Sequence, residues 1–292
     1  MSRLERWGHG VLGTTTALLL VAGVVVGCST GPERASGSNA GSATVVAGDV
    51  PVLTGAPDPA SVPAPVWQAG TRGNGNPLVN FRDTPYNLEG APPPDVADAP
   101  DLEDVRAVRY TMPGGGRRAE LEPNIDVQQE GDDLWFGFAW YLPPDFPVNT
   151  PGWQVLAQWK NAGEGSPPVE IKVGNGQFQL DGGAGGEDPQ ETYFTQPIGP
   201  ARAGLQTNIV VHIVFSTDPT KGQVDVWMNG QQRVAAFRPE GGTRYESADS
   251  YLKTGIYRDT AISEPSVLYL NDARVATSYA SASALASPGA SG

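Results

Sequence analysis

The sequence predicts an all-β domain, and two observations lead to this fold class. Short runs of apolar and aromatic residues recur with turn signals about every 8–12 residues, and hardly any stretch has the 3.6-residue period of a helix. Two of the turn signals, Asn175-Gly176 and Asn229-Gly230, are typical of tight hairpins. For this number of strands we expect a two-sheet β-sandwich of the jelly-roll (concanavalin-like) type.

The expected strands follow from these runs in chain order. They cover residues 105–112, 117–121, 134–142, 153–160, 169–173, 177–180, 209–216, 224–228, 232–237, 251–258 and 267–275. A shorter run at 78–81 predicts an early edge strand. The glycine-rich run 182–186 has no helix after it, so we expect a flexible loop there rather than a phosphate-binding turn.

The composition favours one sizeable exported domain with flexible ends. The chain has 292 residues, including 37 Gly and 27 Pro, and its formal net charge is -13. Residues 1–27 carry a net +1, so the chain without them is near -14. This charge argues against nucleic acid as a partner, because phosphate neutralisation dominates such binding. An anionic ligand would need a local basic patch.

The first 28 residues predict export. Arg3 and Arg6 precede an apolar run, residues 17–26, that is too short for a comfortable membrane span and is typical of a signal peptide. Val25-Val26-Gly27-Cys28 resembles the bacterial lipobox, in which the cysteine becomes the lipidated first residue. An ordinary signal peptide with an incidental cysteine is the alternative. We therefore expect attachment to the outer face of the bacterial cytoplasmic membrane through Cys28, or secretion.

The remaining chain divides into three parts by composition. Residues 28–66 are rich in Gly, Ser, Ala and Pro and predict a disordered tether. Residues 67–279 form the expected β-domain, and residues 280–292 a disordered Ser/Ala/Gly tail. Cys28 is the only cysteine, so no internal disulfide can form.

The run 251–258 carries an unusual face when it is read as a strand. Successive side chains alternate, so its polar face consists of Tyr251, Lys253, Gly255 and Tyr257. Buried lysine is rare unless paired, buried tyrosine needs a hydroxyl partner, and a glycine among them allows close approach of a ligand. This face predicts the floor of a binding cleft; a solvated outer strand is the alternative.

Two further strands alternate in the same way. The run 153–160 has an expected core face made of Trp153, Val155, Ala157 and Trp159. Its opposite face carries Gln154, Leu156, Gln158 and Lys160. Arg118 and Glu120 share one face of the run 117–121. Together, the three strands predict a concave polar groove.

These strands carry a family resemblance. Arg118-Ala119-Glu120-Leu121, Gln158-Trp159-Lys160 and the run 251–257 resemble the ordered motifs R-x-E-L, Q-x-H and Y-x-K-x-G-x-Y of jelly-roll alginate lyases. The Gln-Trp-Lys and Gly-Ile-Tyr-Arg segments are closer to the heparin lyase I and glucuronan lyase group. The resemblance covers about residues 112–275. It implies a polysaccharide lyase that cleaves a glucuronate-type polymer by β-elimination. A non-catalytic carbohydrate-binding lipoprotein with the same groove is the alternative.

The resemblance also implies roles for the site residues. In β-elimination a base removes the proton α to the carboxylate, cations and neutral groups stabilise the enediolate, and an acid protonates the leaving oxygen. Gln158 and Arg118 would bind the substrate carboxylate, and Lys253 would support a tyrosine that acts as base and acid. The alginate lyases point to Tyr251 as that tyrosine and heparin lyase I points to Tyr257, which we favour while keeping both. Further substrate contacts are expected from Glu120, Lys160 and Arg258.

One residue departs from the alginate lyase pattern. Lys160 occupies the position of the motif histidine, and lysine is a poor proton shuttle at neutral pH. His212 lies among apolar residues, so we expect a structural role for it. A zinc site or a Ser-His-Asp triad lacks the residues it needs, and a two-carboxylate site at Glu120 and Glu122 lacks a second acidic strand face. We expect a monomer with no required cofactor; some relatives hold a structural calcium ion, but no ligand set stands out here.

Overall fold

The computed structural model describes residues 62–84, 87–161, 165–184, 192–245 and 249–285. The predicted signal peptide, Cys28 and nearly all of the predicted tether lie outside these residues. No helix in the described part of the chain is long and apolar enough to cross a membrane.

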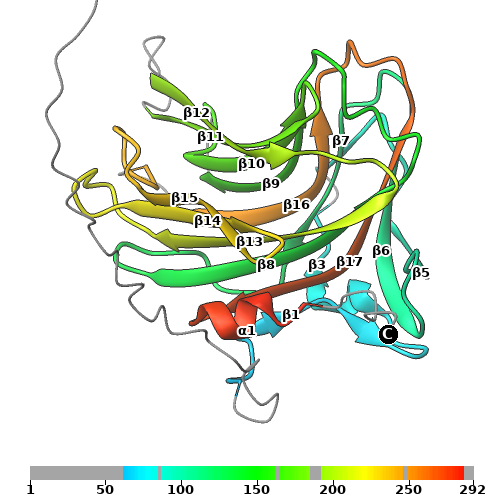
Figure 1. Cartoon of the computed structure of the whole chain (residues 1–292), viewed down its shortest axis with the longest axis horizontal. Helices are drawn as coiled ribbons and strands as arrows, with labels where there is room; N and C mark the ends of the chain where they lie inside the picture. Colours follow the sequence, from blue (N-terminus) through cyan, green and yellow to red (C-terminus); the bar gives the residue numbers. More distant parts are fainter. Residues whose placement is uncertain (1–61, 85–86, 162–164, 185–191, 246–248, 286–292) are drawn as a thin grey trace, which may run out of the picture. The chain divides into compact units, whose positions relative to one another are not determined.

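Two antiparallel sheets lie face to face, with β9, β10, β11 and β16 in one layer and β8, β13, β14 and β15 in the other (Figure 1). The first sheet has the order β15-β14-β13-β8-β17-β6-β2, with β1 paired to β17 and β5 to β6. Its strands are β1 (Trp67–Gln68), β2 (Thr71–Arg72), β5 (Asp95–Asp98), β6 (Val105–Met112), β8 (Asp133–Leu142), β13 (Leu205–Val214), β14 (Gln223–Met228), β15 (Gln231–Phe237) and β17 (Ser266–Ala276).

The second sheet has the order β12-β11-β10-β9-β16-β7-β3, with β4 paired to β7. Its strands are β3 (Phe81–Arg82), β4 (Leu88–Glu89), β7 (Arg118–Pro123), β9 (Gln154–Asn161), β10 (Val169–Gly174), β11 (Gln177–Ala184), β12 (Thr192–Pro200) and β16 (Ser250–Arg258). The all-β, two-sheet sandwich predicted from the sequence is therefore confirmed.

Large side chains fill the space between the sheets. Phe136, Phe138 and Trp140 point inward from β8 and are almost completely buried. Trp159 from β9 contacts Phe136 edge-on at 4.9 Å between ring centroids, and Phe178 from β11 stacks on Trp140 at 6.4 Å. Burial of such aromatic groups supplies much of the free energy of folding. The inward position of Trp159 turns its neighbour Gln158 to the opposite face of the second sheet.

Local sequence explains the hairpins. Asn175-Gly176 joins β10 to β11, and Asn229-Gly230 joins β14 to β15; all four residues have positive φ between 50° and 79°. A type I′ turn needs this backbone at both central positions, and Asn and Gly reach it with the least strain.

Three expectations about elements need correction. The run 78–81 is mostly a 3₁₀ helix, η2 (Pro77–Asn80), because Asn76 caps it and Pro77 opens it; the strand there is only Phe81–Arg82. Strand β12 was not predicted, since its Pro and Gly residues interrupt the alternation. Residues 182–184 belong to β11 rather than to a loop.

The C-terminal boundary also differs. Helix α1 (Tyr279–Ser283) follows β17, and its residue Ala282 is fully buried. A Cβ on Gly137 of β8 would lie 2.1 Å from the Ala282 carbonyl oxygen, so this glycine allows the close approach of α1. The prediction of a disordered tail is therefore wrong for residues 280–285. Residues 286–292 lie outside the described residues.

Candidate functional site

A cleft of about 300 Å³ lies on the outward face of the second sheet. Its lining includes five of the predicted site residues, namely Arg118, Gln158, Lys160, Lys253 and Tyr257. They come from β7, β9 and β16, strands that are neighbours in the sheet although they are distant in the sequence. The three polar faces that the alternation predicted thus contribute to one surface.

Strand register explains which side chains meet. Lys253 of β16 pairs with Gln158 of β9, which pairs with Glu170 of β10, which pairs with Asp181 of β11. Residues directly opposite in an antiparallel pair lie about 4.5–5.5 Å apart at Cβ. These four residues therefore form a continuous row across the cleft. A second row includes Arg118, Tyr257, Val155 and Lys172.

An extra residue in β9 changes the predicted faces of that strand. The pairing with β10 runs from Ala157 directly to Val155, so Leu156 has no partner and the alternation reverses at this point. Leu156 is consequently buried in the core, and Gln154 is buried with its amide bonded to the Pro147 carbonyl. Trp153 and Val155 line the cleft. Their predicted core positions are therefore wrong, whereas that of Trp159 is right.

Gly255 lies on β16 between Lys253 and Tyr257, and it cannot be replaced by a larger residue without movement of the backbone. Its φ is +148°, and an added Cβ would lie 2.2 Å from the Ala119 carbonyl oxygen. Gly255 pairs with Glu120 of β7, so the two strands lie in close contact at this point. The amide of Gln158 donates a hydrogen bond of 2.6 Å to Glu120 Oε1.

Glu120 is buried below the floor, with only 2% of its surface exposed. Burial raises the pKa of its carboxyl group, although Lys253, Arg118 and Gln158 act in the opposite direction. Arg118 Nε lies 3.5 Å from Glu120 Oε2. The expectation that Glu120 binds substrate is therefore not supported by its position. It holds Gln158 and Arg118 in place from below.

Lys253 is buried next to Glu120, with only 3% of its surface exposed. Its ammonium group donates a hydrogen bond of 2.7 Å to Asn87 Oδ1 and lies 3.9 Å from Glu122 Oε1. Asn87 in turn donates to Glu122 at 2.9 Å and is itself fully buried. Burial lowers the pKa of Lys253. Asn87 was not predicted, because it lies before β4 in a segment without a recognisable motif.

The two candidate tyrosines differ in position. Tyr257 lines the cleft, with the Arg118 guanidinium 4.2 Å above its ring centroid and Trp153 edge-on at 4.8 Å. The Arg117 guanidinium lies 5.8 Å from the same ring centroid, so two guanidinium groups lie near this ring. Tyr251 pairs with Lys160, and Lys253 Nζ lies 5.4 Å from its ring centroid. Among the described residues, the lining of the cleft includes Tyr257 and not Tyr251.

Arg258 does not reach the cleft. It is fully buried on the other face of β16, and its guanidinium donates to the carbonyls of Gly116, Pro113 and Glu264 and to Ser266 Oγ. Its predicted role in substrate binding is therefore wrong, because its hydrogen bonds fix the surrounding loops.

Lys160 and His212 occupy different sheets. Lys160 lines the cleft and donates a hydrogen bond of 2.9 Å to the Gly165 carbonyl. His212 lies on β13, stacked on Trp135 and bonded to Asp133 at 2.7 Å and to Asp225 at 3.1 Å. This arrangement agrees with the structural role expected for His212.

The cleft has a local excess of positive charge in an acidic chain. Four cationic side chains line it: Arg118, Lys160, Lys172 and Lys253. Two acidic side chains do so, Glu170 and Asp181, and Asp181 forms an ion pair with Lys172. This is the local basic patch that an anionic ligand requires. No group of three or more residues of the types His, Cys, Asp and Glu that could hold a metal ion occurs in the described part of the chain.

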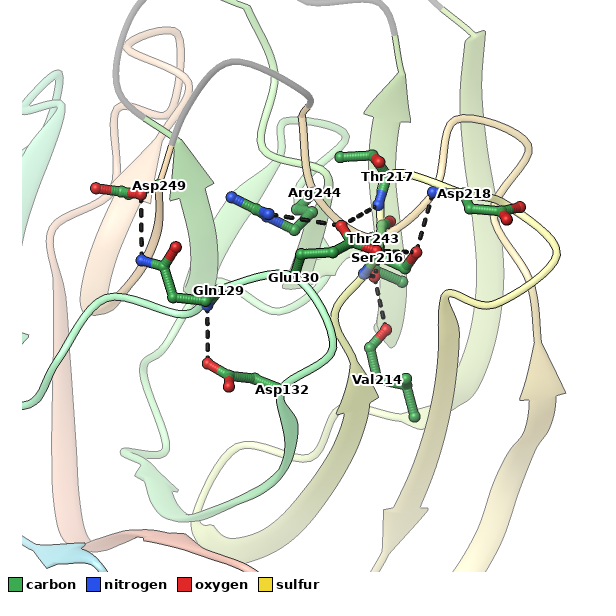
Figure 2. Close-up of polar contacts among 10 residues, drawn as sticks. All are labelled: Gln129, Glu130, Asp132, Val214, Ser216, Thr217, Asp218, Thr243, Arg244 and Asp249. Carbon is green, nitrogen blue, oxygen red and sulfur yellow. Dashed lines mark hydrogen bonds and ion pairs between the residues drawn. The ribbon is translucent and has the colours of Figure 1, made fainter.

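A hydrogen-bonded loop cluster anchors the segment that leads into β16 (Figure 2). We define the loop cluster as Glu130, Ser216, Thr217, Thr243 and Arg244. Glu130 accepts hydrogen bonds from Ser216 Oγ at 2.5 Å and from the Thr217 amide at 2.9 Å, and its ion pair with Arg244 measures 3.5 Å. The next residue, Tyr245, donates a hydrogen bond of 2.6 Å to the carbonyl of Ser166, a cleft-lining residue.

Comparisons with known proteins bear on the fold and on the family. Among solved structures, the endo-β-1,4-glucuronan lyase of the fungus Trichoderma reesei is similar over 74% of this chain and 97% of its own, with a TM-score of 0.58 and 19% identity. Alginate lyase A1-II′ of polysaccharide lyase family 7 matches over 62% of this chain and 84% of its own, with a TM-score of 0.45 and 15% identity. No curated protein sequence matches. The family model for polysaccharide lyases matches residues 82–274, about two thirds of the chain, and the chain therefore belongs to the polysaccharide lyase family.

Proposed function

We propose that the protein cleaves a glucuronate-type polymer by β-elimination at the cleft on the second sheet. The observation that carries the proposal is the meeting of Gln158, Arg118, Lys253 and Tyr257 around one cleft with an excess of positive charge. The fold similarity to an endo-β-1,4-glucuronan lyase supports glucuronate as the sugar. The Gln-Trp-Lys and Gly-Ile-Tyr-Arg segments of the cleft strands, which resemble the heparin lyase I and glucuronan lyase group, support it as well.

The reaction begins at the carbon next to the uronate carboxylate. The proton on C5 moves to the phenolate oxygen of Tyr257, and the electron pair of the C–H bond passes into the carboxylate to give an enediolate. The pair then forms the C4–C5 double bond as the bond between C4 and the glycosidic oxygen breaks. The hydroxyl of Tyr257 gives the proton it has taken from C5 to the leaving oxygen, so the phenolate is restored and proton and charge balance.

The residues around Tyr257 favour the charged species of this reaction. The Arg118 guanidinium lies 4.2 Å and the Arg117 guanidinium 5.8 Å from the ring centroid, and two nearby cations of this kind favour a phenolate. Gln158 is fixed by Glu120 at 2.6 Å, so its amide can bind a uronate carboxylate with little loss of conformational freedom. Lys253 adds a fixed positive charge in the same row.

The Lys160 substitution gives a reason to keep the second candidate, a carbohydrate-binding protein without turnover. Incubation with glucuronan, alginate, heparin and hyaluronan separates the two. We expect ultraviolet absorbance from unsaturated uronate ends to grow with glucuronan. Binding of a polymer without any growth in absorbance would support the second candidate, and neither binding nor absorbance would exclude both.

We further propose that lipidated Cys28 tethers the enzyme at the outer face of the cytoplasmic membrane. The motivating feature is Val25-Val26-Gly27-Cys28 after a short apolar run. The variant Cys28→Ala should lose labelling by a fatty-acid analogue and leave the membrane fraction. Unchanged membrane association in this variant would contradict lipid anchoring.

A further inference from the structure

Glu170 is a cleft residue that the proposed mechanism does not use. It lies on β10 between Gln158 of β9 and Asp181 of β11, and its side chain lines the cleft. In the described part of the chain its carboxyl group makes no hydrogen bond to another residue. A carboxyl group beside the residue that should bind the substrate carboxylate, and without a partner of its own, calls for a functional explanation.

The charges around Glu170 oppose its ionisation. Asp181 on β11 and Glu120 on β7 are like charges, and Lys172, the cation that favours ionisation of Glu170, is paired with Asp181. Lys160 on β9 and Lys253 on β16 line the same cleft but bond to Gly165 and Asn87. Burial, and after it Asp181, raises the pKa of Glu170 to about 8, although the residue keeps some exposure through the cleft. The group therefore holds its proton at neutral pH.

A protonated carboxyl group suits a site for an acidic polymer. An ionised Glu170 would repel a uronate, whereas a neutral one can donate a short, charge-assisted O–H···O⁻ hydrogen bond to it. The register places this donor one strand away from Gln158, on the same face of the sheet. Glu170 and Gln158 can therefore both donate a hydrogen bond to the same substrate carboxylate, each from its own strand.

We propose that Glu170 binds the substrate in its protonated form, donating a hydrogen bond to a uronate carboxylate next to Gln158. This inference rests on the proposed function and adds a group that recognises the acid function of the sugar. The proton stays on Glu170 throughout. The hydrogen bond strengthens as negative charge builds on the carboxylate in the enediolate, so the same contact lowers the barrier.

Binding must then depend on the protonation of Glu170. The test uses the full chain carrying Tyr257→Phe, to prevent cleavage, and a β-1,4-linked glucuronate tetramer in titration calorimetry between pH 6 and pH 9. Above a pKa of about 8, affinity should fall by up to about tenfold per pH unit, since the protonated fraction falls at that rate. Adding Glu170→Gln, which keeps the shape and a donor but cannot ionise, should remove this alkaline loss.

Two further variants separate recognition from structure. Glu170→Ala should weaken binding about tenfold or more at pH 6, because the donor is lost. Asp181→Asn removes a like charge and frees Lys172, so the alkaline loss should begin at a lower pH. A purely structural role for Glu170 would not move this pH profile.

The outcomes are distinct. An alkaline loss that persists unchanged in the Glu170→Gln variant, or a Glu170→Ala variant that binds like its parent at pH 6, overturns the inference while leaving the lyase function intact. A wild-type chain that neither cleaves nor binds glucuronate or alginate oligomers overturns the proposed function and this inference with it.

Discussion

In the loop cluster, Glu130 accepts two short hydrogen bonds and pairs with Arg244, and the first of these contacts, from Ser216, lowers the pKa of its carboxyl group. On the wall of the cleft, Glu170 has no such partners among the described residues, and burial raises its pKa to about 8. Glu120, below the floor, is intermediate between these two in its number of partners. Gln158 donates to its Oε1, no hydrogen bond from a described residue reaches Oε2, and burial raises its pKa too.

The difference separates groups that stabilise the fold from groups that stay available to a ligand. Glu130 is half exposed, yet its hydrogen bonds are provided by loops that meet only in the folded chain (Figure 2). Among the described residues, Glu170 has lost water without gaining a hydrogen-bond donor, and Glu120 has gained a donor for only one of its two oxygens. Such burial is unfavourable for folding and is typical of functional sites. Substitutions in the cleft should therefore reduce activity, and substitutions in the loop cluster should reduce stability.

The largest effect on activity is expected from Tyr257→Phe. The ring keeps its contacts with Arg118 and Trp153, so stability should change by about 1 kcal/mol or less. Loss of the acid–base group should lower turnover on the order of 10²-fold or more. Tyr251→Phe is the matched control and should cost only a few-fold. Initial rates measured by ultraviolet absorbance show which tyrosine is the base. If both variants lose only a few-fold in turnover, tyrosine is not the base.

Lys253→Met should affect both properties, because this residue belongs to the cleft and also to a buried network. The variant leaves Glu120 and Glu122 without their enclosed cation and Asn87 without its donor. Removing one partner of such a network destabilises by about 3–5 kcal/mol. Urea denaturation should show this loss, and the folded fraction should be nearly inactive. A stable Lys253→Met variant with wild-type turnover would contradict the role given to this network.

Glu130→Gln should reduce stability and spare the chemistry. A half-exposed carboxylate with these partners contributes about 1 kcal/mol, which for a domain of this size corresponds to a Tm lower by about 2–4 °C. Turnover per folded molecule should not change. Glu103→Gln, at an exposed carboxylate outside both regions, is the control for loss of charge alone. A large drop in turnover for Glu130→Gln without a drop in Tm would break the distinction between the two regions.

The two regions should also show opposite pH dependences of stability. The pKa of Glu130 is lowered, so its stabilisation is present above the ordinary value of 4.5 and is lost as the pH falls through the lowered pKa. The pKa of Glu170 is raised, so the wild type loses stability as the pH rises from 4.5 to about 8, where the unfolded chain ionises and the folded chain does not.

Unfolding free energies measured across this range should show the two slopes. The unfolding free energy of Glu130→Gln should be furthest below that of the wild type at neutral pH and equal to it at low pH. Glu170→Gln should gain relative stability from pH 4.5 up to about pH 8. If the unfolding free energies of the two variants depended on pH in the same way, the environments of Glu130 and Glu170 would be alike and the comparison would fail.

Much of this arrangement could be predicted from the sequence, because alternation in a strand directly assigns faces. It placed Gln158, Lys253 and Tyr257 on one surface and Trp159 in the core. It failed at Trp153 and Val155, since the extra residue at Leu156 is visible only in the pairing of β9 with β10. Alternation along the run 251–258 also assigns Arg258 to the face opposite Tyr257. Its predicted role in substrate binding depended only on its position directly after the motif at 251–257.

Asn87 and Glu170 could not be predicted for a different reason. Asn87 reaches Lys253 from 166 positions away in the sequence, and nothing local marks it. Glu170 alternates with apolar residues like many solvated glutamates, and its unusual environment arises from β9 and β11 on either side. Pairing across strands, rather than any single strand, creates the properties of these residues.

The central claim is that this cleft cuts a uronate polymer by elimination rather than by hydrolysis. The direct test is mass spectrometry of glucuronan products formed in water enriched in heavy oxygen. Elimination predicts new non-reducing ends that lack one water, with no heavy oxygen taken up at the new reducing ends. Saturated ends with heavy oxygen incorporated at each cut would contradict it.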